Sequence, residues 1–401
     1  MEARSLAEAG GAVWAHVQDT LWAVLSCLRC GARGTDIDIN GTTYEVVKLL
    51  GEGGFSLVYL VRDVPTGTPY ALKRIRCQYA EAVRDALSEV EAMKRFRGAN
   101  VIRVYDACVR QDADSGASTM LGNVPAHDEE GLRGGKVVDV LMPYFRNGNV
   151  QDAISMHAVQ NTHFAEAHML RLFLGACRAV ESMHAYTLPH VSVTQAPPSD
   201  AKGEPGNATP LLFDADSVAE SSMYPPSRMS IDEPLEPEST AYAHRDIKPA
   251  NVMVADDGVT GVLMDFGSTI KAHVPIRSRR DAVAHQDLAA ERSSMPYRAP
   301  ELFDVRSDIV LDEKVDVWSL GCTLYAMAYL HSPFETLSTV EQGGSIAMAV
   351  LNGSYKFPDS DVYSPATREI IRRCLQRDPR ARPAVRDVIN DVEAALSECA
   401  A

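Results

Sequence analysis

The sequence predicts an α+β protein with two lobes, a small antiparallel β-sheet lobe with one main helix and a larger helical lobe. The chain has 401 residues, 46% of them hydrophobic and 23% charged, which is enough to bury a large core. Residues 44–110 follow a pattern of strand, glycine-rich turn, strand, strand and helix. Helical patterns dominate residues 242–392, so the second lobe is expected to be mainly α-helical.

Two segments interrupt the lobes and are predicted to be disordered. Residues 111–136 are rich in Gly, Asp and Ser and have no periodicity. Residues 187–240 contain nine prolines, twelve Ser or Thr, and nine acidic residues against two basic ones. Long surface loops cost little closure entropy, so both segments are compatible with folded lobes at 44–145 and 146–396.

Composition excludes several classes of function. The formal net charge of -15 argues against a nucleic-acid-binding surface, which would need a basic stripe. Eight cysteines with mostly unrelated spacings, no apolar stretch of membrane-spanning length and no signal-peptide pattern indicate a reduced, cytosolic setting. Only Cys27 and Cys30 lie close together, and no second ligand pair accompanies them, so we do not expect a zinc site.

The first 43 residues are predicted to form a membrane-attachment segment. Apolar residues recur there at helical spacing: Trp14, Val17, Leu21, Val24, Leu25 and Leu28. Two interpretations of this stripe remain open. It is either a helix that packs on the folded domain or a helix that lies in a membrane interface.

Two loops carry the residues expected to perform chemistry. Residues 244–251 read His-Arg-Asp-Ile-Lys-Pro-Ala-Asn, and an Asp-Phe-Gly sequence begins 14 positions after Asn251. Asp246 offers a carboxylate for a hydroxyl proton, Lys248 a cation for a transferring phosphate, and Asn251 and Asp265 oxygen ligands for Mg²⁺. This is the known loop arrangement of protein kinases, and it predicts phosphoryl transfer.

A glycine-rich turn upstream is expected to bind the phosphates of ATP through backbone N–H groups. The residues assigned to ATP in this turn are Gly51, Glu52, Gly53, Gly54, Phe55, Ser56 and Val58. Ser56 stands where kinases usually have a third glycine, and its small side chain should be tolerated. Ala71 and Lys73 follow in the third strand, and Lys73 is placed to reach the α- and β-phosphates.

Lys73 needs a carboxylate partner, and the next helix offers Glu89 and Glu91. Glu89 is preferred because Ala92 and Met93 share its helical face at i+3 and i+4 and point toward the core. Glu91 would point about 200° away by the helical period. We therefore expect a Lys73–Glu89 ion pair.

The connection between the lobes is expected to contact adenine. Kinases use the carbonyl of the first hinge residue and the N–H of the residue two positions later. Pro143 keeps the acceptor and Phe145 keeps the donor, so the proline is compatible with this role. Met142 is expected at the back of the same pocket.

Further motifs follow in the order seen in kinases. Lys248, two residues after Asp246, is the arrangement of serine/threonine rather than tyrosine kinases. Asp316 is expected to brace the backbone of the catalytic loop, and Arg382 to pair with Glu301 of the Ala-Pro-Glu sequence.

The motifs together resemble the myristoylated and palmitoylated serine/threonine kinases, a Numb-associated-kinase-like group. They are LGEGGFS at 50–56, YALKRI at 70–75, VLMDFGS at 262–268, YRAPELF at 297–303 and DVWSLGCTLYAM at 316–327. The resemblance implies a bilobal eukaryotic protein kinase fold, ATP and Mg²⁺ as cofactors, protein substrates with Ser/Thr acceptors, and autophosphorylation.

The same resemblance implies attachment by acyl chains to the cytoplasmic face of a vacuolar, Golgi or endosomal membrane, with part of the protein cytosolic. Glu2 follows Met1 where N-myristoylation requires glycine, so the resemblance is to a fungal-type vacuolar or Golgi member without that glycine. Cys27 and Cys30 take the place of the family's acylated cysteines. A role in membrane trafficking or in vacuole or Golgi function follows as an expectation.

Two other functions compete with catalysis. One is a pseudokinase scaffold that binds partners through the acidic insert, and the other is a membrane-tethered adaptor. A degenerate site would normally lack at least one of Lys73, Asp246, Asn251 and Asp265, and all four are present. The sequence therefore favours an active kinase, while it predicts no oligomeric state.

Overall fold

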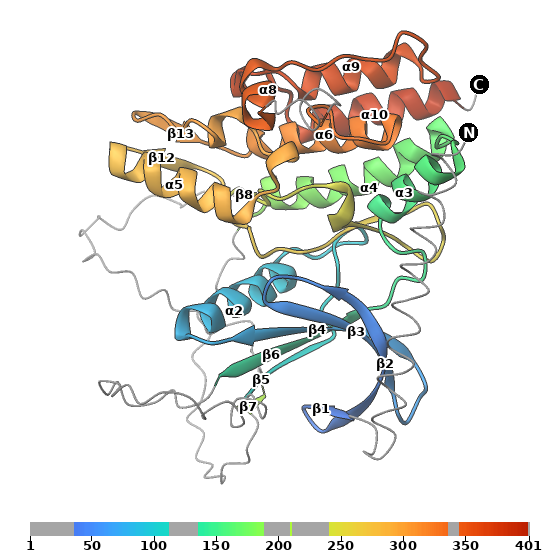
Figure 1. Ribbon diagram of the computed structural model, residues 1–401, viewed down its shortest axis with the longest axis vertical. Coiled ribbons are helices and arrows are strands. Elements are labelled where there is room, and N and C mark those ends of the chain that lie inside the picture. The colour runs from blue at the N-terminus through green and yellow to red at the C-terminus, as the bar shows by residue number, and fades with distance from the viewer. Residues whose placement is uncertain (1–35, 112–134, 188–208, 211–239, 336–344, 400–401) are drawn as a thin grey trace, which may run out of the picture.

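A computed structural model of the chain has two lobes, a β-sheet lobe and a helical lobe, with the α+β architecture expected from the sequence (Figure 1). The structure describes residues 36–111, 135–187, 209–210, 240–335 and 345–399. The predicted helix near the N-terminus, the two cysteines predicted to be acylated and most of both inserts lie outside the described residues.

The sheet lobe contains one seven-stranded antiparallel sheet and one helix. The strands follow the spatial order β1-β2-β3-β4-β6-β5-β7. Their bounds are β1 Ile37–Ile39, β2 Thr42–Glu52, β3 Ser56–Asp63, β4 Pro69–Cys77, β5 Asp106–Gln111, β6 Lys136–Pro143 and β7 Thr209–Pro210. Helix α2, Ala80–Arg95, packs against β4 and β6 and lies between the sheet and the helical lobe (Figure 1).

The sheet lobe begins earlier than the predicted boundary at residue 44. Ile37 and Ile39, which we assigned to the attachment segment, form β1 and are buried. The turn that follows is Asn40–Gly41, and both residues have positive φ angles of 48° and 86°. Asn-Gly between two apolar strands is a strong hairpin signal, because a type I′ turn needs positive φ at both central residues. This hairpin was not predicted from the sequence.

Two residues of the insert predicted to be disordered are instead part of the sheet. Thr209 and Pro210 form β7 and pair with Val109 and Cys108 of β5. The free edge of a sheet offers unpaired N–H and C=O groups, so a passing extended segment pairs with it readily. Proline is tolerated in such an edge strand because its missing N–H faces away from the ladder.

The helical lobe is built around α6, Lys314–Tyr329, which is buried along almost its whole length. The other helices are α3 Val150–Gln160, α4 Glu166–His184, α5 Arg279–Arg292, α8 Ile346–Asn352, α9 Pro365–Cys374 and α10 Val385–Cys399. Three short antiparallel strand pairs complete the lobe: β8 Tyr242–Ala243 with β11 Ile270–Lys271, β9 Val252–Val254 with β10 Gly261–Leu263, and β12 Val274–Ile276 with β13 Ile309–Leu311.

Close contact between α4 and β10 positions the Asp-Phe-Gly loop. A Cβ atom on Gly175 of α4 would lie 2.3 Å from the carbonyl oxygen of Gly261, and a Cβ on Gly261 would lie 2.2 Å from that of Leu172. Any larger side chain would separate the two elements. Because β10 ends at Leu263, this contact sets the position of Asp265 two residues later.

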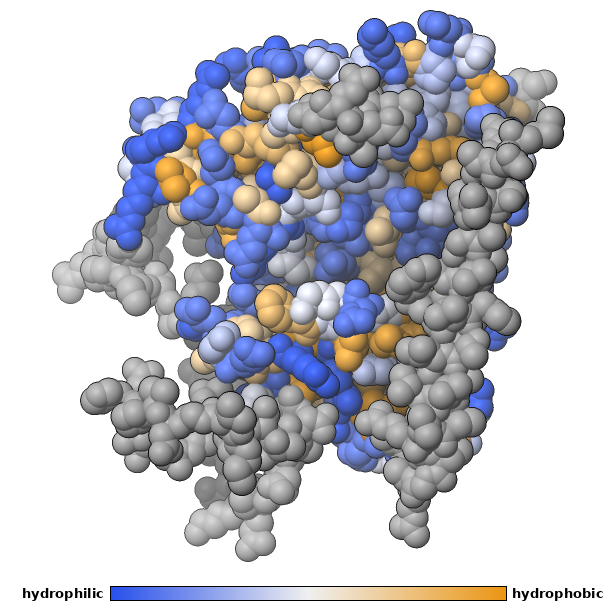
Figure 2. Space-filling model, in the orientation of Figure 1, coloured by the Kyte–Doolittle hydropathy of each residue, from blue (hydrophilic) through white to orange (hydrophobic). Residues whose placement is uncertain are grey.

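The described surface on the face shown in Figure 2 is mostly hydrophilic, with apolar residues interspersed among charged ones. None of the described helices combines the length and the apolar character that crossing a membrane requires.

Candidate active site

A cavity of about 310 Å³ lies between the lobes and has a mainly apolar lining. Val58 and Ala71 contribute from the sheet, and residues 142–146 contribute from the connection between the lobes. Met253 and Met264 line it from the helical lobe. A mainly apolar cavity of this size suits a purine base.

The glycine-rich turn joins β2 to β3 at the mouth of this cavity. The N–H of Gly53 donates to the carbonyl of Ser56 at 2.7 Å, which closes a tight turn. Phe55 at its tip is 77% exposed. Ser56, which replaces the usual third glycine, begins β3, so it lies after the turn and does not obstruct it.

Lys73 of β4 lies between two carboxylates. Its Nζ is 2.6 Å from Oε1 of Glu89 and 3.4 Å from Oδ1 of Asp265. Glu89 belongs to α2 and is buried, whereas Glu91 on the same helix is exposed. The choice of Glu89 over Glu91 therefore agrees with the geometry.

Burial and charge act in opposite directions on these three groups. Burial alone would lower the pKa of Lys73, but Asp265 and Glu89 raise it above its ordinary value, so the ammonium is charged at neutral pH. Burial raises the pKa of Glu89 despite the nearby lysine. Burial would also raise the pKa of Asp265, but Lys73 and His244 lower it. The lowered pKa keeps Asp265 ionised at neutral pH.

Three polar groups hold the carboxylate of Asp246 in place. Its Oδ2 accepts from Nζ of Lys248 at 2.8 Å and from Nδ2 of Asn251 at 3.2 Å. Its Oδ1 accepts from the backbone N–H of Ser294 at 2.8 Å. Lys248 also donates to Oγ of Ser294 at 2.7 Å, so the activation segment and the catalytic loop share one hydrogen-bond network. Asp246 is 9% exposed, and that exposure is its access to a substrate.

Asn251 and Asp265 are suited to bind a divalent cation. The N–H of Met264 donates to the backbone carbonyl of Asn251 at 2.9 Å, which brings the two loops together. Asn251 uses its side-chain nitrogen to donate to Asp246, and its Oδ1 accepts no hydrogen bond from a described residue. Mg²⁺ prefers one or two such oxygen ligands, completed by substrate phosphates and water. Asp265 also has a φ of 64°, a strained backbone of the kind found at functional sites.

Comparison with known proteins agrees with this geometry. The family model described as "Protein kinase domain" matches residues 44–193 and 239–392. The chain belongs to the protein kinase family. The break in the match falls within the acidic insert, so the insert is an addition to the common domain. The predictions of a kinase fold and of a protein kinase enzyme are confirmed.

Three relatives match the kinase over nearly its whole length. It is 31% identical to serine/threonine-protein kinase ppk13 of Schizosaccharomyces pombe over 393 residues, covering 96% of this chain and 99% of the relative. It is 32% identical to serine/threonine-protein kinase ENV7 of Saccharomyces cerevisiae over 388 residues, covering 92% and 96%. It is also 32% identical to human serine/threonine-protein kinase 16 over 364 residues, covering 90% and 93%.

Asp316 of α6 stabilises the backbone of the loop at residues 244–251. Its carboxylate accepts the backbone N–H groups of His244 and Arg245, each at 2.8 Å, and contacts Nε2 of His184 at 3.0 Å. Burial would raise the pKa of Asp316, but His184 and these backbone donors lower it below its ordinary value. Arg245 has a φ of 67°, so the bonds to Asp316 hold a strained turn.

We expect Asp316→Asn to destabilise the kinase by about 1–3 kcal/mol, because the new amide N–H₂ faces buried donors and leaves one unsatisfied. Thermal unfolding measures this, with the exposed Asp304→Asn as the control. The lowered pKa means that the ionised carboxylate stabilises the fold above the unfolded-state value of about 3.9. The difference in stability between Asp316→Asn and wild type should therefore be largest at pH 7 and should shrink as the pH falls below about 4. An unchanged melting temperature at pH 7 would contradict the role of Asp316.

The pairing of Arg382 with Glu301 is also present. Nη1 and Nη2 of Arg382 bond to the two carboxylate oxygens of Glu301 at 2.7 and 2.8 Å. The guanidinium lies 5.1 Å from the centre of the Trp318 ring and is fully buried. A bidentate pair stacked on an aromatic ring needs arginine rather than lysine.

Several cavity residues were not predicted. Leu50, Met253 and Met264 line the nucleotide cavity but have no chemical signature in the sequence. Met253 could have been found from the alternation in β9, where Val252 and Val254 are buried and Met253 points to the other side.

Proposed function

We propose that the kinase transfers the γ-phosphate of ATP to serine and threonine hydroxyls of proteins and also phosphorylates itself. The network around Asp246 is the observation that carries this proposal. Lys248 occupies the position typical of serine/threonine kinases, and the relatives named above are serine/threonine kinases by name.

Each polar residue has a defined task in this reaction. Asp246 orients the acceptor hydroxyl and accepts its proton, because two donors and a backbone N–H hold its carboxylate toward the cleft. Lys73 contacts the α- and β-phosphates, and Glu89 keeps its ammonium in position. Lys248 places a positive charge beside the transferring group.

We further propose Mg²⁺ as the cofactor, bound by Asn251 and Asp265 together with ATP. When bound, the ion supplies positive charge that neutralises the phosphates. The oxygen donor set and the ionised state of Asp265 support a hard cation such as Mg²⁺.

Mass spectrometry of the purified protein, incubated with ATP and MgCl₂, tests this function. We expect phosphate on serine or threonine residues, no such increase in Asp246→Asn, and no increase when EDTA replaces MgCl₂. A pseudokinase scaffold would gain no phosphate in any of these samples. Phosphate found mainly on tyrosine would refute the assigned specificity.

We also propose that the kinase acts on the cytoplasmic face of an internal membrane, in trafficking or in vacuole or Golgi function. The support is the family resemblance, the pair Cys27 and Cys30, and the apolar stripe in the sequence before them. One acyl chain gives only marginal binding, so attachment needs two chains, or one chain assisted by the stripe.

Replacing both Cys27 and Cys30 with serine should shift the kinase from the membrane pellet to the soluble fraction of a cell lysate. Hydroxylamine, which cleaves thioesters, should have the same effect on wild type. Cys399→Ser is the control, because that thiol is exposed. Activity in solution should not change in either variant. A double variant that still pellets would show that acylation is not the anchor.

A further inference from the structure

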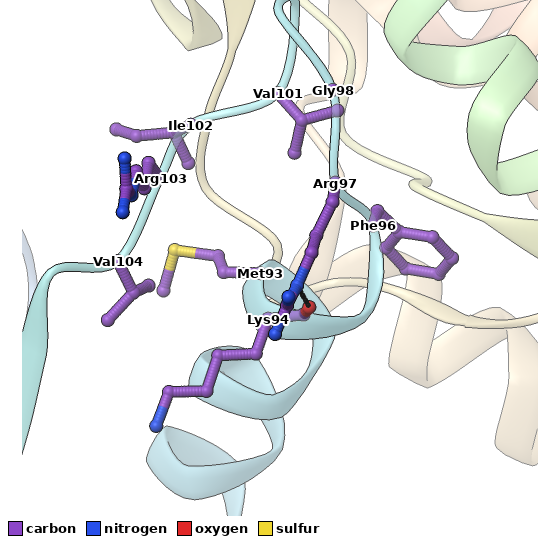
Figure 3. Close-up of a pocket in the computed structure, with 9 residues that line it drawn as sticks. All are labelled: Met93, Lys94, Phe96, Arg97, Gly98, Val101, Ile102, Arg103 and Val104. Atoms are coloured by element: carbon purple, nitrogen blue, oxygen red, sulfur yellow. Dashed lines mark hydrogen bonds between the residues drawn. The ribbon is translucent and has the colours of Figure 1, made fainter. Parts of the chain in front are cut away.

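A second cavity, of about 350 Å³, lies outside the nucleotide site between the C-terminal end of α2 and the segment that leads to β5 (Figure 3). It combines an apolar wall with three cationic side chains. The wall is formed by Met93, Ile102 and Val104, and the cations are Lys94, Arg97 and Arg103. We call this the α2 pocket.

Two cations of the α2 pocket, Arg97 and Arg103, are available to an anionic partner. Among the described residues, no carboxylate lies within ion-pair distance of Arg97 or Arg103, and both are exposed. Arg97 donates its Nε to the carbonyl of Lys94 at 3.2 Å, which leaves its terminal nitrogens free of described partners (Figure 3). The guanidinium of Arg103 lies over the ring of Tyr105 at 5.2 Å.

The acidic insert leaves and re-enters the fold beside this pocket. Phe96 lines the pocket, and its ring contacts those of Tyr186 and Tyr242 at centroid distances of 5.5 and 5.3 Å. The N–H of Thr240 donates to the carbonyl of Tyr186 at 3.0 Å, which joins the two ends of the insert. In Figure 3, Phe96 lies on the opposite side of Arg97 from Met93.

The last residues of the insert have a chemistry that matches the pocket. Residues 232–239 read Asp-Glu-Pro-Leu-Glu-Pro-Glu-Ser, with four acidic side chains, no basic one and a single leucine. Leu235 lies five residues before Thr240, so an extended chain lets it reach about 17 Å from that anchor. Two prolines favour an extended conformation and lower the entropy lost on binding.

We propose that residues 232–239 bind the α2 pocket of the same chain. Leu235 packs on the apolar wall, and the flanking carboxylates pair with Arg97 and Arg103. The tether at Thr240 makes binding intramolecular, so weak individual contacts are sufficient.

The position of the pocket connects this contact to the active site. Ile102 lines both the α2 pocket and the nucleotide cavity. Its N–H donates to the carbonyl of Leu263 at 2.9 Å, two residues before Asp265. Helix α2 carries Glu89, the partner of Lys73. Binding of the acidic segment therefore holds the end of α2 against the strand that leads to the metal-binding carboxylate.

Zero-length carbodiimide cross-linking of the full-length kinase tests the proposal. The reagent joins a carboxylate to a neighbouring amine, so we expect mass spectrometry to find amide links between Lys94 and the acidic residues of 232–239. The double variant Arg97→Gln with Arg103→Gln should reduce the yield of these links at least fivefold. Arg84→Gln is the matched control, because Arg84 is exposed on the same helix outside the pocket, and it should not change the yield.

A second measurement does not depend on variants. Raising NaCl from 0.1 to 1 M shortens the Debye length from about 10 to about 3 Å, which should lower the wild-type yield severalfold. Mixing unlabelled and ¹⁵N-labelled protein identifies links within one chain. Cross-linked peptides that join a labelled to an unlabelled chain as often as random pairing of chains predicts, or a yield that neither salt nor the double variant changes, would overturn the proposal.

Discussion

We expect Asp246→Asn to lower the rate of phosphoryl transfer by roughly 10²–10⁴-fold, the range typical of removing a positioned general base. The amide retains one oxygen acceptor but has no basicity, so it cannot take the hydroxyl proton. Its N–H₂ group would also face Lys248 or the N–H of Ser294, both of which now donate to the carboxylate. Autophosphorylation with radiolabelled ATP measures the loss.

The loss should arise in turnover, because Asp246 is assigned to the acceptor hydroxyl and not to ATP. We expect ATP affinity within a few-fold of wild type and a folded protein by circular dichroism. Asp359→Asn, on an exposed loop, is the control and should retain full activity. If Asp246→Asn phosphorylates itself at the wild-type rate, another group must act as the base.

The catalytic residues could be predicted from the sequence because each needs a particular functional group at a fixed spacing. The assigned roles require a carboxylate at Asp246, an ammonium at Lys248 and an amide at Asn251, so each of these residues is recognisable in the sequence. The Glu89 prediction was of a different kind, since helical periodicity separated it from Glu91. Both kinds of reasoning use local sequence, and the geometry agrees with both.

Features that depend on the tertiary structure could not be predicted in this way. The apolar residues of the nucleotide cavity, such as Met264, look like any core residue until the lobes are placed together. The bond from Lys248 to Ser294 joins residues 46 positions apart, and Ser294 was expected near Asp246 only from its position in the kinase pattern. The α2 pocket likewise forms only when the end of α2 and the segment that leads to β5 pack side by side. In contrast, strand β1 was not predicted, although the Asn40–Gly41 turn is a hairpin signal that can be recognised in the sequence.

We expect Lys73→Met to lower the turnover of the kinase by about 10²–10³-fold, the loss typical of removing one preorganised donor to a developing charge. Unlike Asp246→Asn, it should also weaken ATP binding, because it removes a cation that contacts the phosphates. Equilibrium binding of a fluorescent ATP analogue separates the two effects. Lys48→Met is the control, because Lys48 is exposed on β2 and the ion pairs to Glu89 and Asp265 are made by Lys73.

The same variant should acquire a pH-dependent loss of stability. Without the ammonium, Glu89 and Asp265 face each other with no compensating charge, and burial already raises the pKa of Glu89. A carboxyl group whose pKa is raised in the folded state binds a proton more tightly there than in the unfolded chain. Its contribution to stability is therefore present below the unfolded-state pKa of about 4.3 and is lost as the pH rises through the folded-state value.

Melting temperatures of Lys73→Met and wild type should diverge between pH 5 and pH 8, with the variant the less stable at pH 8. A constant difference across this range would mean that Glu89 does not titrate, and that Lys73 does not control its charge.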